Sequence, residues 1–290
     1  MIQTFLTPFW SRVTPFALTS ADEFRPPAPY SWTKSRDLYI QQATELVDIS
    51  AHLTDSQKAI AEYWSDGAGS VTPPGHWCRI AQFVSLRDHH DLDEDVKMFF
   101  MLTNALFDTS IATWDAKRTY DSVRPITAIR FVFAGKKIQA WGGPGKGTQE
   151  IDGADWKPYQ KSSTVTPPFP EYVSGHSAFS AAAAEVLRLF TGSDAFQDSA
   201  HIGAGSSKIE PGRVPAQEVV LFWATFTDAA DQAGMSRRYS GIHFERGDIM
   251  GRRVGRSVGT QAYNKALSYF HGHAFDPNRK QSAGSSPAVF

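Results

Sequence analysis

Apolar and polar positions alternate with helical spacing over most of the chain. The segment from Ser35 to Ser50 places leucine, isoleucine and valine on one side, and Thr54 before "DSQKAIAEYWSD" is typical of a helix N-cap. The longest helical pattern covers about 30 residues and ends before Pro125. It is apolar over most of its surface, so we expect it at the centre of the core.

The second half of the chain has two long segments without clear periodicity. Residues 135–170 are rich in Gly, Pro, Trp and Lys, and "GAGSSKIEPGRVP" forms a second loop. Helices are predicted over Ala216–Gly234 and from near His243 to about Phe270. Strand patterns are confined to short pieces inside the loops. The predicted fold class is therefore all-α, a helical bundle with long irregular loops.

The pattern divides the chain into three parts. We expect an extended, Pro-rich arm over 1–35, a single helical domain over 36–275 and a loose polar tail over 276–290. The apolar start lacks a basic n-region and is broken by Pro8 and Pro15, so it predicts a structured arm and not a signal peptide. It resembles the middle of a longer chain more than a natural beginning, which leaves the protein's location open.

Glycines recur every fourth residue in the last predicted helix, at Gly247, Gly251, Gly255 and Gly259. Each costs about 1 kcal/mol of helix propensity relative to alanine, so close packing has to compensate. The small Ala181–Ala184 run is the expected partner of this row. Arginines between the glycines argue against a membrane-embedded Gly-xxx-Gly helix.

Composition excludes several classes of function. Hydrophobic residues make up 41% and charged residues 20%, which is typical of a globular protein. The net charge of −1 argues against a nucleic-acid surface, and the single cysteine excludes an intrachain disulfide. No run of about 18 apolar residues predicts a membrane span, so we expect a soluble protein.

Three short motifs carry candidate chemistry, and the first is "KRTYDSVRP". Lys117 and Arg124 are seven residues apart, which places them within about 20° of each other on a helix. Taken alone, the arginine is typical of a solvated helix end, and Lys117 can pair with Asp121 at i+4.

The second motif is Ser174-Gly175-His176, at the start of an apolar, Ala-rich helical pattern. A helix N-terminus offers free N–H groups and a positive dipole end to an anion. Ser174 adds a hydroxyl, Gly175 allows close backbone approach, and His176 can exchange a proton with the anion. A plain N-cap with an incidental histidine is the alternative.

The third motif is "SRRYSGIHFERGD", in which Arg237 precedes His243 by six residues. His243 directly precedes the last predicted helix. A lone histidine at such a place is more often structural than catalytic, so this motif indicates a catalytic site only in combination with the other two.

Together, in this order, "KRTYDSVRP", "VSGHS" and "SRRYSGIH" resemble the signature of the vanadium-dependent haloperoxidase and type-2 phosphatidic acid phosphatase superfamily, in its soluble bacterial haloperoxidase-like branch. The resemblance covers roughly Thr54 to Tyr269. In that superfamily a helical bundle holds one oxyanion, because vanadate and the phosphoryl transition state share a shape. The resemblance therefore implies an anion site for vanadate that phosphate or sulfate can also occupy.

The resemblance also implies roles for individual residues. Lys117, Arg124, Ser174, the Gly175 amide and Arg237 are expected to bind the anion, and an arginine fork suits this task. His176 is the expected acid-base residue, and Lys117 is also expected to be catalytic by polarising the peroxide. His243 is expected to ligate vanadium, or to attack phosphorus in a phosphatase.

Two features depart from the family pattern. Val173 stands where a proline usually precedes Ser-Gly-His. The acidic residue after the last histidine is usually four positions later, whereas Asp248 is five later and Glu245 is also near. Which of these two carboxylates orients His243 is left open.

Two aromatic residues favour the oxidative branch. Trp114 lies one turn before Lys117 and Phe169 seven residues before His176, and both resemble residues that line the halide side in haloperoxidases. The alternative is that both are simply core aromatics.

The expected enzyme oxidises halide with hydrogen peroxide, with vanadate as cofactor, and halogenates a small organic substrate. A phosphomonoesterase with His243 as nucleophile is the alternative. A non-enzymatic scaffold is disfavoured because all the site residues are intact, and a homodimer is left open.

Overall fold

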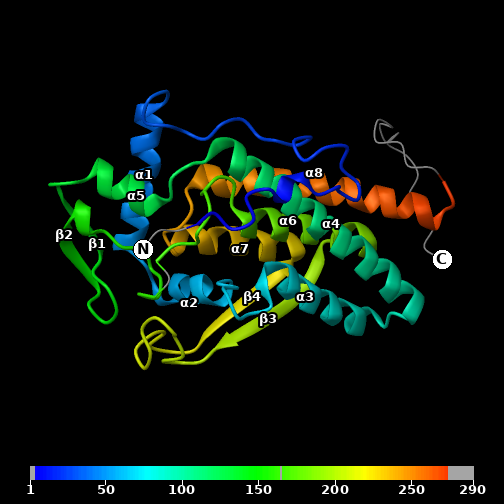
Figure 1. The fold of residues 1–290 in the computed structure, drawn as a ribbon. Helices are drawn as coiled ribbons and strands as arrows, with labels where there is room; N and C mark the ends of the chain where they lie inside the picture. The colour runs from blue at the N-terminus through cyan, green and yellow to red at the C-terminus, as the bar shows by residue number, and fades with distance from the viewer. Residues whose placement is uncertain (1–3, 164, 274–290) are drawn as a thin grey trace.

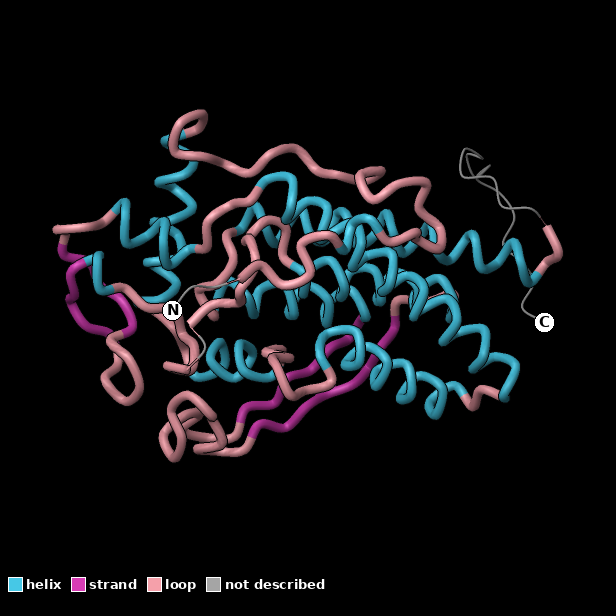
Figure 2. Tube along the Cα trace, viewed as in Figure 1, coloured by secondary structure: helices cyan, strands magenta, loops and turns pink. Residues whose placement is uncertain are grey.

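A computed structural model describes residues 4–163 and 165–273 of the chain. It is mostly helical, with two small hairpins, which confirms the predicted fold class (Figures 1 and 2). The elements follow in the order η1 (Trp10–Arg12), α1 (Arg36–Ala51), α2 (Asp55–Tyr63), α3 (Thr72–Asp88), α4 (Leu92–Tyr120), α5 (Pro125–Val132), β1 (Lys137–Trp141), β2 (Thr148–Asp152), η2 (Gly153–Asp155), α6 (Gly175–Thr191), β3 (Ala195–Ile202), β4 (Val219–Thr225), α7 (Phe226–Tyr239) and α8 (Glu245–Phe270).

Helix α6 lies at the centre of the bundle, with α4, α7 and α8 packed around it (Figure 1). Most of its residues are buried, including the whole Ala181–Ala184 run. Small side chains allow neighbouring helices to approach closely from several directions. The motif at the N-terminus of α6 is therefore surrounded by three other helices.

The glycine row of α8 faces α6, as predicted. A Cβ added to Gly255 would lie 2.1 Å from the Ala178 carbonyl oxygen, and one added to Gly259 would lie 2.7 Å from that of Ala182. Nearer the N-terminus of α6, a Cβ on Gly251 would come within 2.8 Å of the Ser174 carbonyl oxygen. Backbone therefore packs on backbone, which holds the start of α8 against the start of α6.

Helix α4 is the long apolar helix that the sequence predicts, but it ends earlier than expected. It stops at Tyr120, and Asp121 takes the left-handed conformation at its C-cap. Arg124 is extended and forms the N-cap of α5. The inference that Lys117 and Arg124 leave one helix face is therefore wrong, although the turn between α4 and α5 still brings them together.

The structure also corrects the helix predicted over Ala216–Gly234. Residues Val219–Thr225 form strand β4 and pair antiparallel with β3, and α7 begins only at Phe226. The run "VVLFWAT" is β-branched and aromatic, which suits a strand with an available partner. Strands β1 and β2 form a second antiparallel hairpin inside the predicted loop 135–170.

The N-terminal arm runs along the bundle instead of leaving it (Figure 1). The buried carboxylate of Asp108 on α4 accepts hydrogen bonds from the backbone N–H groups of Phe16, Ala17 and Leu18. Further along, Arg25 forms a bidentate ion pair with Asp115, at 2.6 and 2.8 Å. We propose that the arm and the helical domain are one structural unit; the tail expected over 276–290 lies outside the described residues.

None of the helices within the described ranges has a stretch long and apolar enough to span a bilayer.

Candidate active site

His243 lies directly before α8, among the residues of all three motifs. Its Nδ1 is 2.8 Å from Glu171 Oε1, and its Nε2 accepts a hydrogen bond from Arg124 Nη1 at 3.0 Å. The side chains of His243 and Glu171 are only 3% and 2% exposed. A carboxylate beside Nδ1 fixes the proton on that side of the ring, so the lone pair lies on Nε2, where Arg124 Nη1 donates to it.

Glu171 therefore replaces the two carboxylates that the sequence suggested for this role. Asp248 instead forms a buried ion pair with Arg252 at 2.8 Å and accepts a hydrogen bond from the Ser177 hydroxyl at 2.8 Å. Glu245 is largely exposed, with its carboxylate 3.7 Å from Arg238. The expectation that Asp248 or Glu245 orients His243 is wrong, because Glu171 contacts Nδ1 and the other two carboxylates have other partners.

Arg124 donates to the segments on both sides of the site. Its Nε donates to the Phe169 carbonyl and its Nη1 to the Ile242 carbonyl, each at 2.9 Å. Nη2 is buried and has no hydrogen-bond partner among the described residues. Burial lowers the pKa of this guanidinium to about 10, and the nearby positive charge of Arg237 acts in the same direction. A buried donor without a partner is costly, and a bound anion would remove that cost.

Lys117 is fully buried in the last turn of α4 and does not pair with Asp121. Its ammonium donates to the carbonyl oxygens of Pro170, Glu171 and Val173, at 2.8, 3.1 and 2.6 Å. Burial, followed by the charge of Arg124, lowers its pKa well below the usual value. Lys117 therefore holds the segment that leads into α6 and places a positive charge beneath it.

The Ser-Gly-His motif forms the N-terminus of α6. Ser174 is the N-cap, and its Oγ accepts a hydrogen bond from the Ser177 N–H at 3.3 Å. The N–H groups at the start of a helix have no intrahelical acceptor, so those of Gly175 and His176 are available to an anion. The plain N-cap that was the alternative interpretation of this motif is present, and it leaves the Gly175 and His176 N–H groups available to bind an anion.

His176 lies at the side of the cluster that faces α2. Its Nε2 is 3.3 Å from the Ser65 carbonyl oxygen. Burial lowers its pKa well below the usual value of 6.5, and the positive charge of Arg237 adds to this effect. The imidazole is therefore neutral near pH 7 and can accept a proton.

Arg237 approaches from the last turn of α7. Its Nη2 donates to the Ala61 carbonyl at 2.8 Å and its Nε to the Ser236 hydroxyl at 2.9 Å, and it is only 2% exposed. Burial lowers the pKa of its guanidinium to about 10, and the carboxylate of Asp66 opposes that change. The third motif thus contributes a second buried guanidinium.

Trp114 and Phe169 form an aromatic wall next to the cations. Their ring centroids are 5.2 Å apart with an interplanar angle of 46°. Lys117 Nζ lies 5.1 Å and Arg124 Cζ 5.0 Å from the Phe169 ring centroid, within the range of cation–π contacts. The two aromatic residues singled out in the sequence are therefore neighbours of each other and of the first motif.

The charge around His243 fits an oxyanion. Burial, followed by the charges of Arg124, Lys117 and Arg237 among others, lowers the pKa of His243 well below its usual value. Three buried cations cost free energy unless anions compensate for them. Glu171 supplies one negative charge here, and burial raises its pKa to about 7. The orphaned Nη2 of Arg124 and the α6 amides add donors, so the residues present fit a highly charged anion such as vanadate or phosphate.

No group of three or more His, Cys, Asp or Glu side chains within residues 4–163 and 165–273 could hold a metal cation.

Sequence reasoning missed Glu171, although a signal was present. It is the only acidic residue between Asp155 and Glu185, and it stands in the apolar, Pro-rich run before Ser174. A lone carboxylate in such a run is buried only where a partner compensates for it. That partner is His243, 72 residues away.

Comparison with known proteins shows which family the chain resembles. The family model for the VCPO second helical-bundle domain matches residues 97–272. A holo-type bacterial vanadium-dependent chloroperoxidase is similar at a TM-score of 0.83 and 29% identity, over 92% of this chain and 56% of that one. Its apo-type structure gives the same TM-score and identity, over 92% and 57% of the two chains. A bacterial vanadium-dependent iodoperoxidase is similar at a TM-score of 0.71 and 27% identity, over 90% and 58%.

The chain spans less than two thirds of the length of each of these structures. Among curated proteins, no sequence matches. The family model nevertheless covers more than half of the chain and includes all three motifs. The chain therefore belongs to the VCPO second helical-bundle family, within the vanadium haloperoxidase and type-2 phosphatidic acid phosphatase superfamily.

Proposed function

We propose that this protein is a vanadate-dependent haloperoxidase that oxidises halide with hydrogen peroxide. The observation that carries the proposal is the surroundings of His243 Nε2. Glu171 holds the opposite ring nitrogen at 2.8 Å, and three buried cations surround the ring. Two of the similar structures are a chloroperoxidase and an iodoperoxidase, which supports the same chemistry.

Each residue near the anion has a distinct role in this proposal. His243 Nε2 would ligate vanadium, while Arg124, Arg237, Ser174 and the Gly175 amide would bind the anion's oxygens. Donors fixed in advance around developing charge usually make the largest catalytic contribution. Lys117 contributes mainly its charge, because its three N–H groups already have carbonyl partners.

When bound, vanadate supplies a Lewis acid that activates hydrogen peroxide without changing its own oxidation state. His176 is neutral near pH 7 and takes a proton from the incoming peroxide. The Trp114–Phe169 wall gives the halide a weakly hydrated face beside the positive charges. The product is hypohalous acid, which halogenates an organic molecule.

Phosphomonoester hydrolysis is the second candidate, and the geometry of His243 favours it too. An imidazole whose Nδ1 is held by a carboxylate presents Nε2 as a nucleophile, and the same cations would bind phosphate. His176 would then protonate the leaving group.

The two functions separate when one preparation is assayed for both. We expect bromination that requires both peroxide and vanadate, with little cleavage of a phosphate monoester in vanadate-free buffer. A phosphatase would show the reverse, together with a phosphohistidine that is trapped by acid quenching and lost in His243→Ala. That reverse result would overturn the haloperoxidase proposal.

A further inference from the structure

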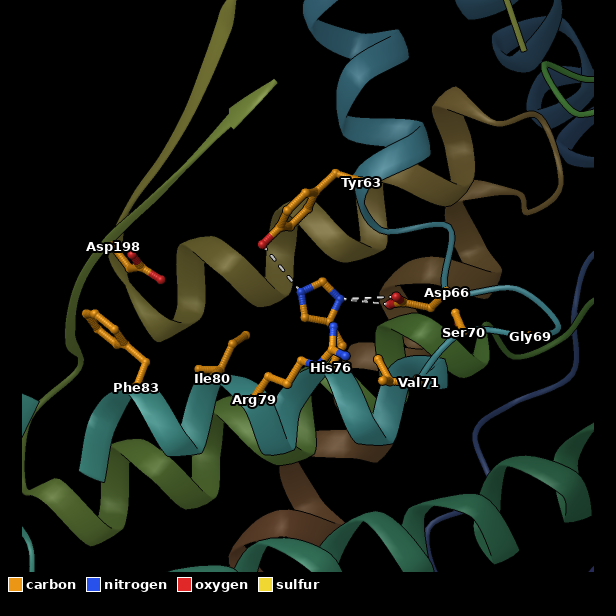
Figure 3. Close-up of a pocket in the computed structure, with 10 residues that line it drawn as sticks. All are labelled: Tyr63, Asp66, Gly69, Ser70, Val71, His76, Arg79, Ile80, Phe83 and Asp198. Carbon is orange, nitrogen blue, oxygen red and sulfur yellow. Dashed lines mark hydrogen bonds and ion pairs between the residues drawn. The ribbon is translucent and has the colours of Figure 1, made fainter. Parts of the chain in front are cut away.

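A cavity of about 700 Å³ opens beside the anion site, between α2, α3 and β3 (Figure 3). Asp66, at the end of the short segment Trp64–Asp66, is one of the residues that line it. In the same segment, the Ser65 carbonyl oxygen lies 3.3 Å from His176 Nε2, and the charge of Asp66 acts on Arg237. None of the proposed anion-binding residues lines the cavity, and the segment Trp64–Asp66 links the two regions.

His76 lies among the lining side chains, and its ring is held in place (Figure 3). Its Nδ1 is 3.1 Å from both carboxylate oxygens of Asp66, and the Trp64 ring stacks on it with centroids 4.6 Å apart. A carboxylate on Nδ1 fixes the tautomer with its proton there, so Nε2 is an acceptor. No role in the chemistry at His243 accounts for this arrangement.

The contact that Nε2 makes is long. The Tyr63 hydroxyl is 3.4 Å away, near the outer limit of a hydrogen bond. Burial, followed by the charges of Asp198 and Asp66, raises the pKa of Tyr63 to about 12, so this phenol keeps its proton. The Tyr63 hydroxyl therefore makes only a long contact with His76 Nε2, and a ligand hydroxyl at a shorter distance could donate to this nitrogen instead.

The remaining lining combines apolar and polar groups. Ile80 and Phe83 follow His76 along one face of α3, and Asp198 lies opposite on β3 (Figure 3). Small-molecule sites typically have volumes of about 300–1,000 Å³ and a mainly apolar lining with a few fixed polar groups. The carboxylates of Asp66 and Asp198 outnumber the one guanidinium of the lining, that of Arg79, which disfavours an anionic ligand.

We propose that this cavity binds the organic substrate as a neutral hydroxylated aromatic compound, whose hydroxyl donates to His76 Nε2 while its rings pack on Ile80 and Phe83. This inference rests on the proposed haloperoxidase function only for the reaction that follows binding. The segment Trp64–Asp66 links the cavity to His176, so hypohalous acid made at the anion site is formed close to the bound ring.

The chemistry balances with His76 as a base. The phenolic O–H bond breaks as its proton moves to Nε2, which makes the ring more electron-rich. A ring carbon then attacks the halogen of hypohalous acid, and the oxygen–halogen bond breaks. The released hydroxide takes the proton that the ring carbon loses and leaves as water. His76 finally returns its proton to the oxygen, giving the halogenated phenol.

Direct binding tests the site without turnover. Calorimetry of vanadate-free protein should show 2-naphthol binding about tenfold more tightly than naphthalene, the equivalent of one hydrogen bond. His76→Phe should remove this preference, whereas His52→Phe, the same change at an exposed histidine, should retain it. Equal binding of the two probes, or a preference that survives in His76→Phe, would overturn the proposal.

A second variant keeps the test decisive if His76→Phe does not fold. Ser70 is exposed at the rim of the cavity, so Ser70→Trp fills its mouth from outside the core. We expect this change to weaken 2-naphthol binding by about tenfold or more. Unchanged binding in Ser70→Trp would show that the probe binds elsewhere, which rejects the cavity as its site.

Activity separates this inference from the proposed function. Triiodide formation from iodide and peroxide needs no organic substrate, whereas naphthol bromination does. His76→Phe should lower kcat/KM for naphthol bromination about tenfold more than it lowers triiodide formation. Equal losses in both assays would contradict the substrate role of His76. A parent protein that binds naphthol but forms no triiodide would contradict the haloperoxidase function and leave the binding result standing.

Discussion

Glu171 Oε1 lies 2.8 Å from His243 Nδ1, and this contact joins the segment before α6 to the segment before α8. The same oxygen accepts a hydrogen bond from the Phe244 N–H at 3.2 Å. A Cβ at Gly247 would come within 2.0 Å of it, so the carboxylate needs a residue without a side chain there. The first glycine of the α8 row therefore makes room for the group that orients His243.

Glu171→Gln should weaken vanadate binding. The amide keeps the size of the side chain but cannot stabilise the imidazole as a carboxylate does, and loss of such a partner typically costs about 10–100-fold in metal affinity. Equilibrium dialysis of vanadate against the parent and the variant measures this loss.

Glu245→Gln is the matched control, because Glu245 is an exposed carboxylate two residues after His243. We expect it to bind vanadate like the parent. Equal affinity in all three proteins would contradict the role given to Glu171.

Gly255→Ala should destabilise the protein even though alanine favours a helix. The new Cβ would meet the Ala178 carbonyl oxygen at 2.1 Å, and backbone cannot move aside cheaply. We expect a net loss of about 1–3 kcal/mol in the free energy of unfolding, measured by urea denaturation. Gly203→Ala, at a glycine with open space around it, should leave stability nearly unchanged. A Gly255→Ala variant as stable as the parent would show that α6 and α8 are not in close contact.

The helices and their packing followed from the sequence wherever periodicity was strong. Helix α8 begins within two residues of the expected position, and its glycine row faces α6 as the spacing implied. The run of strand β4 is apolar without alternation, a pattern that also suits a helix, and only its pairing with β3 decides its conformation. Local pattern cannot show a partner that is distant in the sequence.

The site was predictable in its residue types but not in its contacts. Lys117 and Arg124 were paired on one helix face, whereas a left-handed Asp121 ends α4 between them. Glu171 was missed because its link to His243 spans 72 residues, and proximity in sequence favoured Asp248. Such long-range contacts depend on how α6 packs against α8.

Lys117→Met should loosen the segment that leads into α6. Removing the ammonium leaves the carbonyl oxygens of Pro170, Glu171 and Val173 without that donor. We expect backbone amides in this segment to exchange hydrogen at least about tenfold faster, as a local opening costs less free energy. Lys137→Met, at an exposed lysine of β1, is the control. Unchanged exchange in Lys117→Met would mean that the lysine does not hold this segment.

His176 makes the stability of the protein depend on pH. Its folded-state pKa lies well below 6.5, so below pH 6.5 the unfolded chain takes up a proton that the folded protein does not. This contribution is therefore complete above pH 6.5 and is lost as the pH falls below it. His176→Asn removes it, so the stability of the parent relative to the variant should fall between about pH 7 and about pH 5. Urea denaturation of both proteins across this range measures the difference, and a constant difference would contradict it.

The central claim is that the three motifs form one oxyanion site that holds vanadate on His243. The most direct measurement is vanadate binding to the purified protein by equilibrium dialysis, with phosphate as competitor and His243→Ala beside the parent. We expect one vanadate per chain, displaced by phosphate, and at least about tenfold weaker binding in the variant. Equal vanadate binding by the parent and His243→Ala, or no binding by either, would contradict the account.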